Sequence, residues 1–157
     1  MVLLTHLDTR NNAIMVDVAS KPDTKRTAVA SGKIRMNHAA YTAVAGGTAP
    51  KGDVLSGARI AGIMAVKQTS TLIPLCHTLL LASASIDFTF LPQTDTIETV
   101  CTVSAMGKTG VEMEALTGVS VALLTIYDFC KAIDRSMHLE DVHLRLKDGG
   151  KSGHYEA

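Results

Sequence analysis

The sequence has few aromatic residues and no tryptophan. Tyrosine and phenylalanine make up 4% of the 157 residues, whereas hydrophobic residues as a whole make up 46%. Leucine, isoleucine, valine, alanine and methionine must therefore fill the core. This length and composition are typical of one globular domain and exclude a disordered or fibrous chain. We predict a single domain over residues 1–157.

An excess of one charge is also lacking. Fifteen lysines and arginines balance fifteen aspartates and glutamates, so no net charge draws the protein to nucleic acid or to an anionic membrane. We expect neither of these partners, although local groups of basic residues can still bind phosphate.

Cysteines are few and far apart. Cys76, Cys101 and Cys130 form no C-x-x-C pair, and this pattern favours reduced thiols in the cytoplasm over a disulfide scaffold. The three cysteines and six histidines also lack the spacing of zinc ligands, so no metal site is expected. The first residues lack the pattern of a signal peptide, and Pro74 and His77 interrupt the longest uncharged stretch. We expect a cytoplasmic protein without a membrane span.

The hydrophobic pattern alternates in four segments and has helical spacing in two others. The predicted strands span residues 26–36, 79–91, 96–106 and 137–147, and the predicted helices span residues 53–71 and 111–135. Their order is that of an α+β ferredoxin-like β-α-β-β-α-β sandwich. We also expect an irregular N-terminal arm over residues 1–24, an extra short helix over 38–45 and a flexible C-terminal tail over 148–157.

The predicted helix over residues 111–135 carries apolar residues on nearly every face. A helix that covers one side of a sheet needs only an apolar stripe, so we expect another subunit to bury its remaining sides. Thr109 and Glu112 have the spacing of a capping box at its start. The helix therefore predicts a homo-oligomer.

Asp128 and Lys131 lie near the end of this helix. We expect the apolar surroundings between Tyr127 and Phe129 to desolvate Asp128 and raise its pKa, which suits general acid–base catalysis. An ion pair between Asp128 and Lys131 without any chemical role is an equally strong alternative.

Glu112 and Glu114 lie in the first turn of the same helix, where the helix dipole favours carboxylates. The alternative for Glu112 is a capping role alone. Glu114 lies within about 40° of Asp128 around the helix, yet about 21 Å from it along the axis. A site that uses both carboxylates needs an extended ligand or a second subunit.

Leu75, Cys76 and His77 lie in a predicted connection between a helix and a strand, where functional groups are common. Cys76 and His77 are adjacent, so their side chains diverge from an extended backbone and a nucleophile pair is not expected. His77 is the better candidate because histidine titrates near neutral pH. The alternatives are a small buried cysteine and a histidine that only forms a hydrogen bond.

Several basic residues are candidates for an anion site. Lys51 lies at a predicted helix start, where backbone N–H groups favour an anion. Four others can extend this site if the fold gathers them, namely Arg26, Lys67, Lys108 and Lys147. Solvated surface side chains are the alternative for each.

Seven stretches of the sequence closely resemble the cyclic pyranopterin monophosphate synthase family of molybdenum cofactor biosynthesis. They are Met15–Val18, Lys51–Val54, Ala58–Ile63, Ile73–His77, Gly107–Thr117, Leu124–Ala132 and Gly149–Gly153. The resemblance spans almost the whole chain, and the run around Met113 is highly specific.

The resemblance implies a phosphorus–oxygen lyase that converts 3′,8-cyclo-7,8-dihydro-GTP to cyclic pyranopterin monophosphate and releases diphosphate. It also implies a ferredoxin-like subunit in a homohexamer of three dimers, with sites at the dimer interface. The resemblance implies that no cofactor is required and that Mg²⁺ can accompany the substrate phosphates.

By matching motif, the resemblance implies catalytic roles for Asp128, Lys131 and Lys51. It implies substrate contacts for Leu75, Cys76, His77, Glu112, Met113, Glu114, Lys67, Arg26 and Lys147. Two residues depart from the family pattern. Thr78 replaces a common proline and is expected to change the stiffness of its loop, whereas His154 replaces a common acidic residue without effect.

Two other functions stay open. One is a non-catalytic ferredoxin-like ligand-binding regulatory oligomer, in which the charged residues form interface ion pairs. The other is a GTP ring-opening cyclohydrolase, which calls for a metal cluster that the sequence does not indicate.

Overall fold

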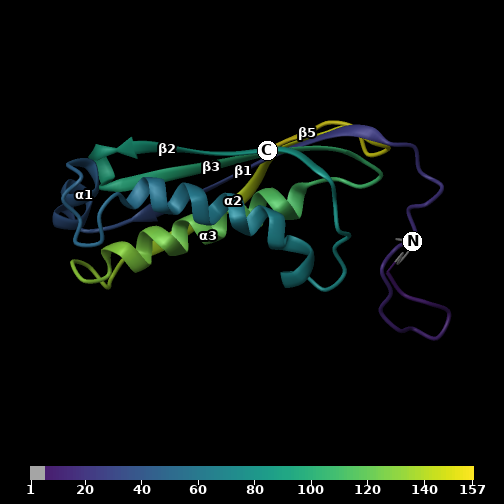
Figure 1. Ribbon diagram of the computed structural model, residues 1–157, viewed down its shortest axis with the longest axis horizontal. Coiled ribbons are helices and arrows are strands. Elements are labelled where there is room, and N and C mark those ends of the chain that lie inside the picture. Colours follow the sequence, from purple (N-terminus) through teal and green to yellow (C-terminus); the bar gives the residue numbers. More distant parts are fainter. Residues whose placement is uncertain (1–5) are drawn as a thin grey trace.

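The computed structural model describes residues 6–157, and its five strands form one antiparallel sheet (Figure 1). They are β1 (Thr24–Arg35), β2 (Leu81–Leu91), β3 (Thr96–Gly107), β4 (His138–Asp148) and β5 (Tyr155–Glu156), in the order β2-β3-β1-β4-β5. Helix α2 (Val54–Leu72) connects β1 to β2, and α3 (Glu112–Cys130) connects β3 to β4. The predicted α+β ferredoxin-like sandwich is confirmed, and the four long strands lie within two residues of their predicted bounds.

The helices cover one face of the sheet. Figure 1 shows α2 and α3 along this face and α1 (His38–Ala45), the expected extra helix, at one end of the molecule. Helix α2 begins after Asp53, whose carboxylate accepts a hydrogen bond from the Ser56 amide at 3.0 Å. This cap fixes the end of the loop that carries Lys51.

Helix α3 ends at Cys130, five residues before its predicted end. The chain turns there because the Cys130 carbonyl accepts hydrogen bonds from the amides of Ile133 and Asp134, at 2.8 and 3.1 Å. The Asp134 carboxylate then accepts a hydrogen bond from the Asn37 amide at 2.7 Å, which ties this turn to the start of α1.

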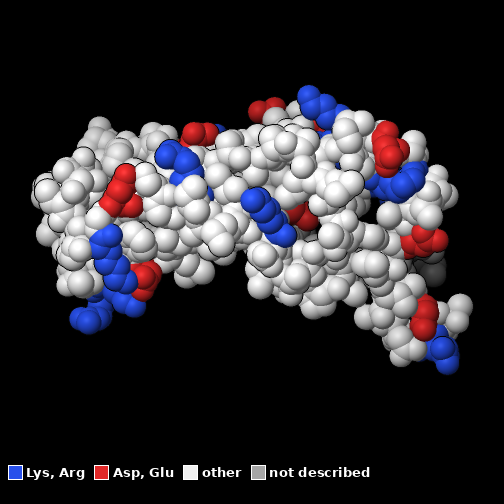
Figure 2. Space-filling model, viewed as in Figure 1, with Lys and Arg blue, Asp and Glu red and all other residues white. Residues whose placement is uncertain are grey.

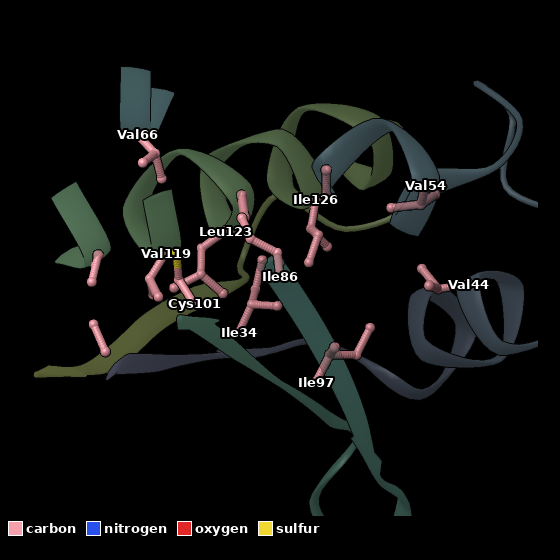
Figure 3. Packing of buried hydrophobic residues seen from close by; sticks show 14 of the residues in the cluster. Ile34, Val44, Val54, Val66, Ile86, Ile97, Cys101, Val119, Leu123 and Ile126 are labelled. Carbon is pink, nitrogen blue, oxygen red and sulfur yellow. The ribbon is translucent and has the colours of Figure 1, made fainter. Parts of the chain in front are cut away.

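Aliphatic side chains fill the space between the sheet and the helices, as the composition predicts. Figure 3 shows Ile34, Ile86 and Ile97 of the strands together with Leu123 and Ile126 of α3. None of these five side chains is more than 1% exposed. Helix α3 is therefore the core helix of the fold, although its length and composition alone would also suit a membrane span.

Two glycines allow α2 to cross α3 closely. A Cβ atom added at Gly62 would lie 2.9 Å from the carbonyl oxygen of Gly118, so a larger residue would force the helices apart. This close crossing holds the second half of α2, and the connection that follows it, over the first turns of α3.

The two ends of the chain differ in regularity. Within the described part of the arm, residues 6–23 contain one isolated bridge and otherwise no helix or strand, as expected. Figure 1 shows the arm reaching away from the sheet. The C-terminal segment, expected as a flexible tail over 148–157, instead contains β5, which pairs with the end of β4. A turn at Gly149–Gly153, with three glycines at positive φ, folds the chain back onto the sheet.

Candidate active site

A cavity of about 290 Å³ lies at the N-terminal end of α3. Six residues expected to contact substrate line it, namely Leu75, Cys76, His77, Glu112, Met113 and Glu114. The arm adds His6, Val16, Val18 and Lys21, and the remaining lining residues are Leu79, Thr109 and Gly110. We call this cavity the pocket.

Glu114 is the buried acid of the pocket. The residue is 5% exposed, and this burial raises the pKa of its carboxyl, with the nearby Glu112 carboxylate adding to the effect. Glu114 therefore holds a proton at pH values where an exposed glutamate is ionised. It is placed to act as a proton donor.

His77 lines the pocket, and a hydrogen bond to the arm fixes its tautomer. Its Nε2 lies 2.8 Å from the carbonyl oxygen of Val16, and because a carbonyl only accepts, Nε2 carries the hydrogen. In the neutral ring Nδ1 then carries the free lone pair and is a hydrogen-bond acceptor. The neighbouring Cys76 thiol has a raised pKa, chiefly through burial and further through Glu114, so it is not an activated nucleophile.

Lys67 adjoins the pocket from α2. It lines a small cavity together with Glu114 and His77, so the structure brings this predicted contact to the same place. Thr78, which replaces the common proline, donates a hydrogen bond to Ser70 Oγ at 3.2 Å. That bond attaches the connection to α2, whereas a proline at this position would stiffen the backbone of the connection.

A second cavity of about 520 Å³ is strongly basic. Five cationic side chains line it, namely Lys21, Arg26, Lys108, Lys147 and Lys151, and Glu112 is the acidic residue among its lining. Arg26 is 7% exposed, and its Nε donates a hydrogen bond to the Gly107 carbonyl at 3.2 Å. We call this cavity the basic groove, and its charge suits a chain of phosphates.

Glu112 belongs to the basic groove and does not cap α3. Val111, not Thr109, is the N-cap residue of α3, and the cap has no side-chain hydrogen bond. The predicted capping box is therefore wrong. The Glu112 carboxylate lies 3.5 Å from Lys147 Nζ and folds over Gly110, because the nearby cation attracts it more than the helix end does.

Lys21 is a lining residue that the sequence analysis missed. It lines both the pocket and the basic groove. Lys108 fixes it there, since Lys108 Nζ donates hydrogen bonds to the carbonyls of Ala19 and Lys21 at 2.9 and 2.6 Å. No sequence signal marks Lys21, which lies in an ordinary turn of the arm.

Removing the ammonium of Lys108 is expected to loosen the arm. In a Lys108→Met variant the turn that carries Lys21 loses two charge-assisted hydrogen bonds, so we expect KM to rise about three- to tenfold while kcat changes less. Lys33→Met, which removes a lysine paired with Asp141 at 2.7 Å on the sheet, is the control. Steady-state kinetics test this, and equal KM values in both variants would contradict it.

Lys51, Asp128 and Lys131 form a separate charged cluster at the other end of α3. Asp128 Oδ2 lies 2.6 Å from Lys51 Nζ, and Oδ1 lies 2.7 Å from Lys131 Nζ. The Asp128 side chain is 48% exposed, and the hydrogen bonds from Lys131 and Lys51 lower its pKa to about 2. The expected raised pKa is therefore wrong, because the two ammonium groups outweigh any desolvation.

The structure does not bring the charged cluster to the pocket within one chain. None of its three residues lines the pocket or the basic groove. Asp128 follows Glu114 by fourteen residues of one helix, which corresponds to about 21 Å. Figure 2 shows charged side chains in small groups on one face of the molecule, with wide uncharged areas between them.

No metal-binding group of three or more histidine, cysteine or acidic residues occurs among residues 6–157. The expectation that no cofactor is required stays a prediction. The polar groups that the chain does offer are cations for phosphate and three acid–base candidates, namely Glu114, His77 and the Lys–Asp–Lys cluster.

Comparison with known proteins gives consistent matches. A model of the MoaC family matches residues 15–150. Proteins called "Cyclic pyranopterin monophosphate synthase" are similar over nearly the whole chain. That of Clostridium botulinum is 58% identical over 150 residues, which is 96% of this chain and 94% of that protein. Those of Novosphingobium aromaticivorans and Roseiflexus sp. are 56% and 55% identical, covering 98% and 97% of this chain and 97% and 96% of their own.

Proposed function

The chain belongs to the MoaC family, and from this we propose that it is a cyclic pyranopterin monophosphate synthase. Relatives 55% to 58% identical carry the name of an enzyme, which favours catalysis over a regulatory binding module. In this proposal the protein is a phosphorus–oxygen lyase of molybdenum cofactor biosynthesis. It converts 3′,8-cyclo-7,8-dihydro-GTP to cyclic pyranopterin monophosphate and releases diphosphate.

The observation that carries this proposal is that the pocket and the basic groove adjoin each other. Lys21, Glu112 and the Thr109–Gly110 segment line both cavities. A ligand with a heterocycle at one end and a phosphate chain at the other can therefore lie along both. A cyclised guanosine triphosphate has this form.

Acid–base residues of the pocket suit the rearrangement of the base. Opening one ring and closing the pterin ring require proton transfers at nitrogen and carbon. Glu114, whose carboxyl has a raised pKa, donates one proton, and His77 Nδ1 accepts another. The charged cluster supplies the ionised Asp128 between two ammonium groups.

The basic groove suits the phosphate chemistry. When a substrate hydroxyl gives its proton to a general base and forms a bond to the α-phosphorus, the bond from that phosphorus to the bridging oxygen breaks and diphosphate leaves with the electron pair. Arg26, Lys147 and Lys21 face the negative charge that develops there. Where Mg²⁺ accompanies the phosphates, it adds to this neutralisation.

The separation of the charged cluster from the pocket supports a site shared between subunits. In our proposal two copies pair so that Lys51, Asp128 and Lys131 of one copy complete the pocket of the other, and three such dimers form a homohexamer. Exposed apolar side chains on the helices, namely Ile60, Met64, Leu72 and Leu124, offer contact surface. The enzyme works in the cytoplasm, without a nucleic-acid or membrane partner.

Turnover of the cyclised nucleotide tests the proposed function. The protein is expected to release one diphosphate for each pterin product, which becomes fluorescent after oxidation. Coupled diphosphate detection and fluorescence chromatography measure the two products. Tight binding of the nucleotide without either product would instead establish the regulatory binding module.

A further inference from the structure

Phe129 lies between the charged cluster and α2. The centre of its ring is 5.7 Å from Lys51 Nζ, which is within the range of a cation–π interaction. A Cβ atom added at Gly57 of α2 would lie 2.9 Å from Cζ of the same ring. The ring is therefore seated on the bare backbone of Gly57 and extends toward Lys51.

We propose that Phe129, seated on Gly57, is a positioning residue that holds the Lys51 ammonium against Asp128. The inference rests on the proposed function, in which the charged cluster takes part in catalysis. Asp128 and Phe129 are consecutive residues in the last turn of α3. Lys51 therefore interacts with the carboxylate of one and the ring of the next.

The two lysines of the cluster differ in how they are held. Lys131 follows Asp128 by three residues on consecutive turns of the same chain, so local geometry already brings them together. Lys51 comes from the exposed loop before α2 and precedes Gly52, which has φ 88°. It lies 77 residues from Asp128 in the sequence, so local geometry does not bring its flexible side chain to the carboxylate. The ring attracts the Lys51 ammonium without competing for the carboxylate.

The absence of a side chain at Gly57 leaves space for the Phe129 ring. A methyl group at this position would overlap the ring edge, so Gly57→Ala must displace the ring. The residue is half-buried and lies within α2, where glycine is otherwise less favourable than alanine. Close contact with Phe129 explains why glycine is accommodated here.

Fluorinated phenylalanines at position 129 test the proposal, because fluorine weakens the negative ring face and hardly changes its shape. We expect kcat to fall about two- to fivefold along the mono-, di- and trifluoro series. KM is expected to stay constant, since Phe129 lines neither the pocket nor the basic groove. The same series at Phe88, whose ring lies 5.3 Å from the Arg59 guanidinium, is the matched control and should change neither constant.

Two variants complete the test. Gly57→Ala and Phe129→Leu are expected to lower kcat about fivefold in the otherwise normal enzyme and to have no further effect in a Lys51→Ala background. An unchanged kcat across the fluorinated series, in an enzyme that turns over normally, would overturn the positioning role and leave a purely packing one.

A readout without turnover separates this proposal from the proposed function. The ring should shift the NMR signals of the Lys51 εCH₂ protons upfield, and Phe129→Leu should abolish the shift. Shifted signals in a protein without synthase turnover would overturn the proposed function alone. Absence of the shift in the unaltered protein would overturn the positioning role alone.

Discussion

Replacing Asp128 by asparagine is expected to lower kcat about a hundredfold or more. The change keeps the shape of the side chain but removes the negative charge that binds Lys51 Nζ at 2.6 Å and Lys131 Nζ at 2.7 Å. Both lysines then lose the partner that orients them, and the site loses its ionised carboxylate. Single-turnover kinetics with the cyclised nucleotide measure this loss.

The same substitution is expected to leave the fold intact. The Asp128 side chain is 48% exposed, and exposed ion pairs contribute little to stability. Asp141→Asn is the matched control, because Asp141 is 49% exposed and pairs with Lys33 at 2.7 Å. Similar thermal midpoints with a loss of turnover only in Asp128→Asn would support the catalytic role. Near-normal turnover in both Asp128→Asn and Lys131→Ala would refute it.

Acid titration gives a separate test of the charged cluster. The pKa of Asp128 falls from its ordinary value of 3.8 to about 2 on folding. The ionised form therefore adds a small stabilisation to the native state above pH 4, because solvent screens this half-exposed side chain, and the contribution is lost as the pH falls from about 4 to about 2. Asp128→Asn should lack this part of the acid-unfolding curve, as measured by circular dichroism.

Mixing two inactive variants is expected to restore about one quarter of the wild-type activity if two subunits share each site. Glu114→Gln disables the pocket, and Asp128→Asn disables the charged cluster. In a mixed dimer one site receives both defects and the other receives neither. Half of all dimers are mixed at equal expression, and half of their sites are intact, so about a quarter of all sites work.

Co-expression with two affinity tags makes the mixing experiment decisive. Activity is measured in oligomers that carry both tags. Co-expressed Asp128→Asn and Lys131→Ala, which lie in the same half of the site, should show no recovery and serve as the control. A Glu114→Gln and Asp128→Asn mixture that stays inactive would show that each subunit completes its own site.

Local sequence patterns predicted the fold well because they depend on near neighbours. The alternation in β1 and β3 reflects which side chains lie on the buried face of the sheet. The spacing in α2 reflects which side chains lie on the buried stripe of the helix. The end of α3 was misplaced because the turn after Cys130 depends on Asp134 binding the amide of Asn37, far away in sequence. The capping box at Glu112 failed because Lys147, from β4, attracts that carboxylate.

The candidate site was only partly predictable. Family motifs marked six of the thirteen residues that line the pocket as substrate contacts, and these six lie in two continuous stretches of the chain. Lys21 was missed, because Lys108 places it through two backbone carbonyls that no pattern reveals. The contact between Phe129 and Gly57 was missed for the same reason, as it joins two helices.

The sequence by itself determined the order of strands and helices, the aliphatic core and the family. It also placed Glu114 and Asp128 within about 40° of one face of a helix. Only the tertiary structure decided that these two carboxylates are opposites, one buried with a raised pKa and the other exposed with a pKa of about 2. The physical reason is that a pKa depends on what covers a side chain. The second half of α2 and the connection after it surround Glu114, whereas Asp128 meets two ammonium groups at the open end of α3.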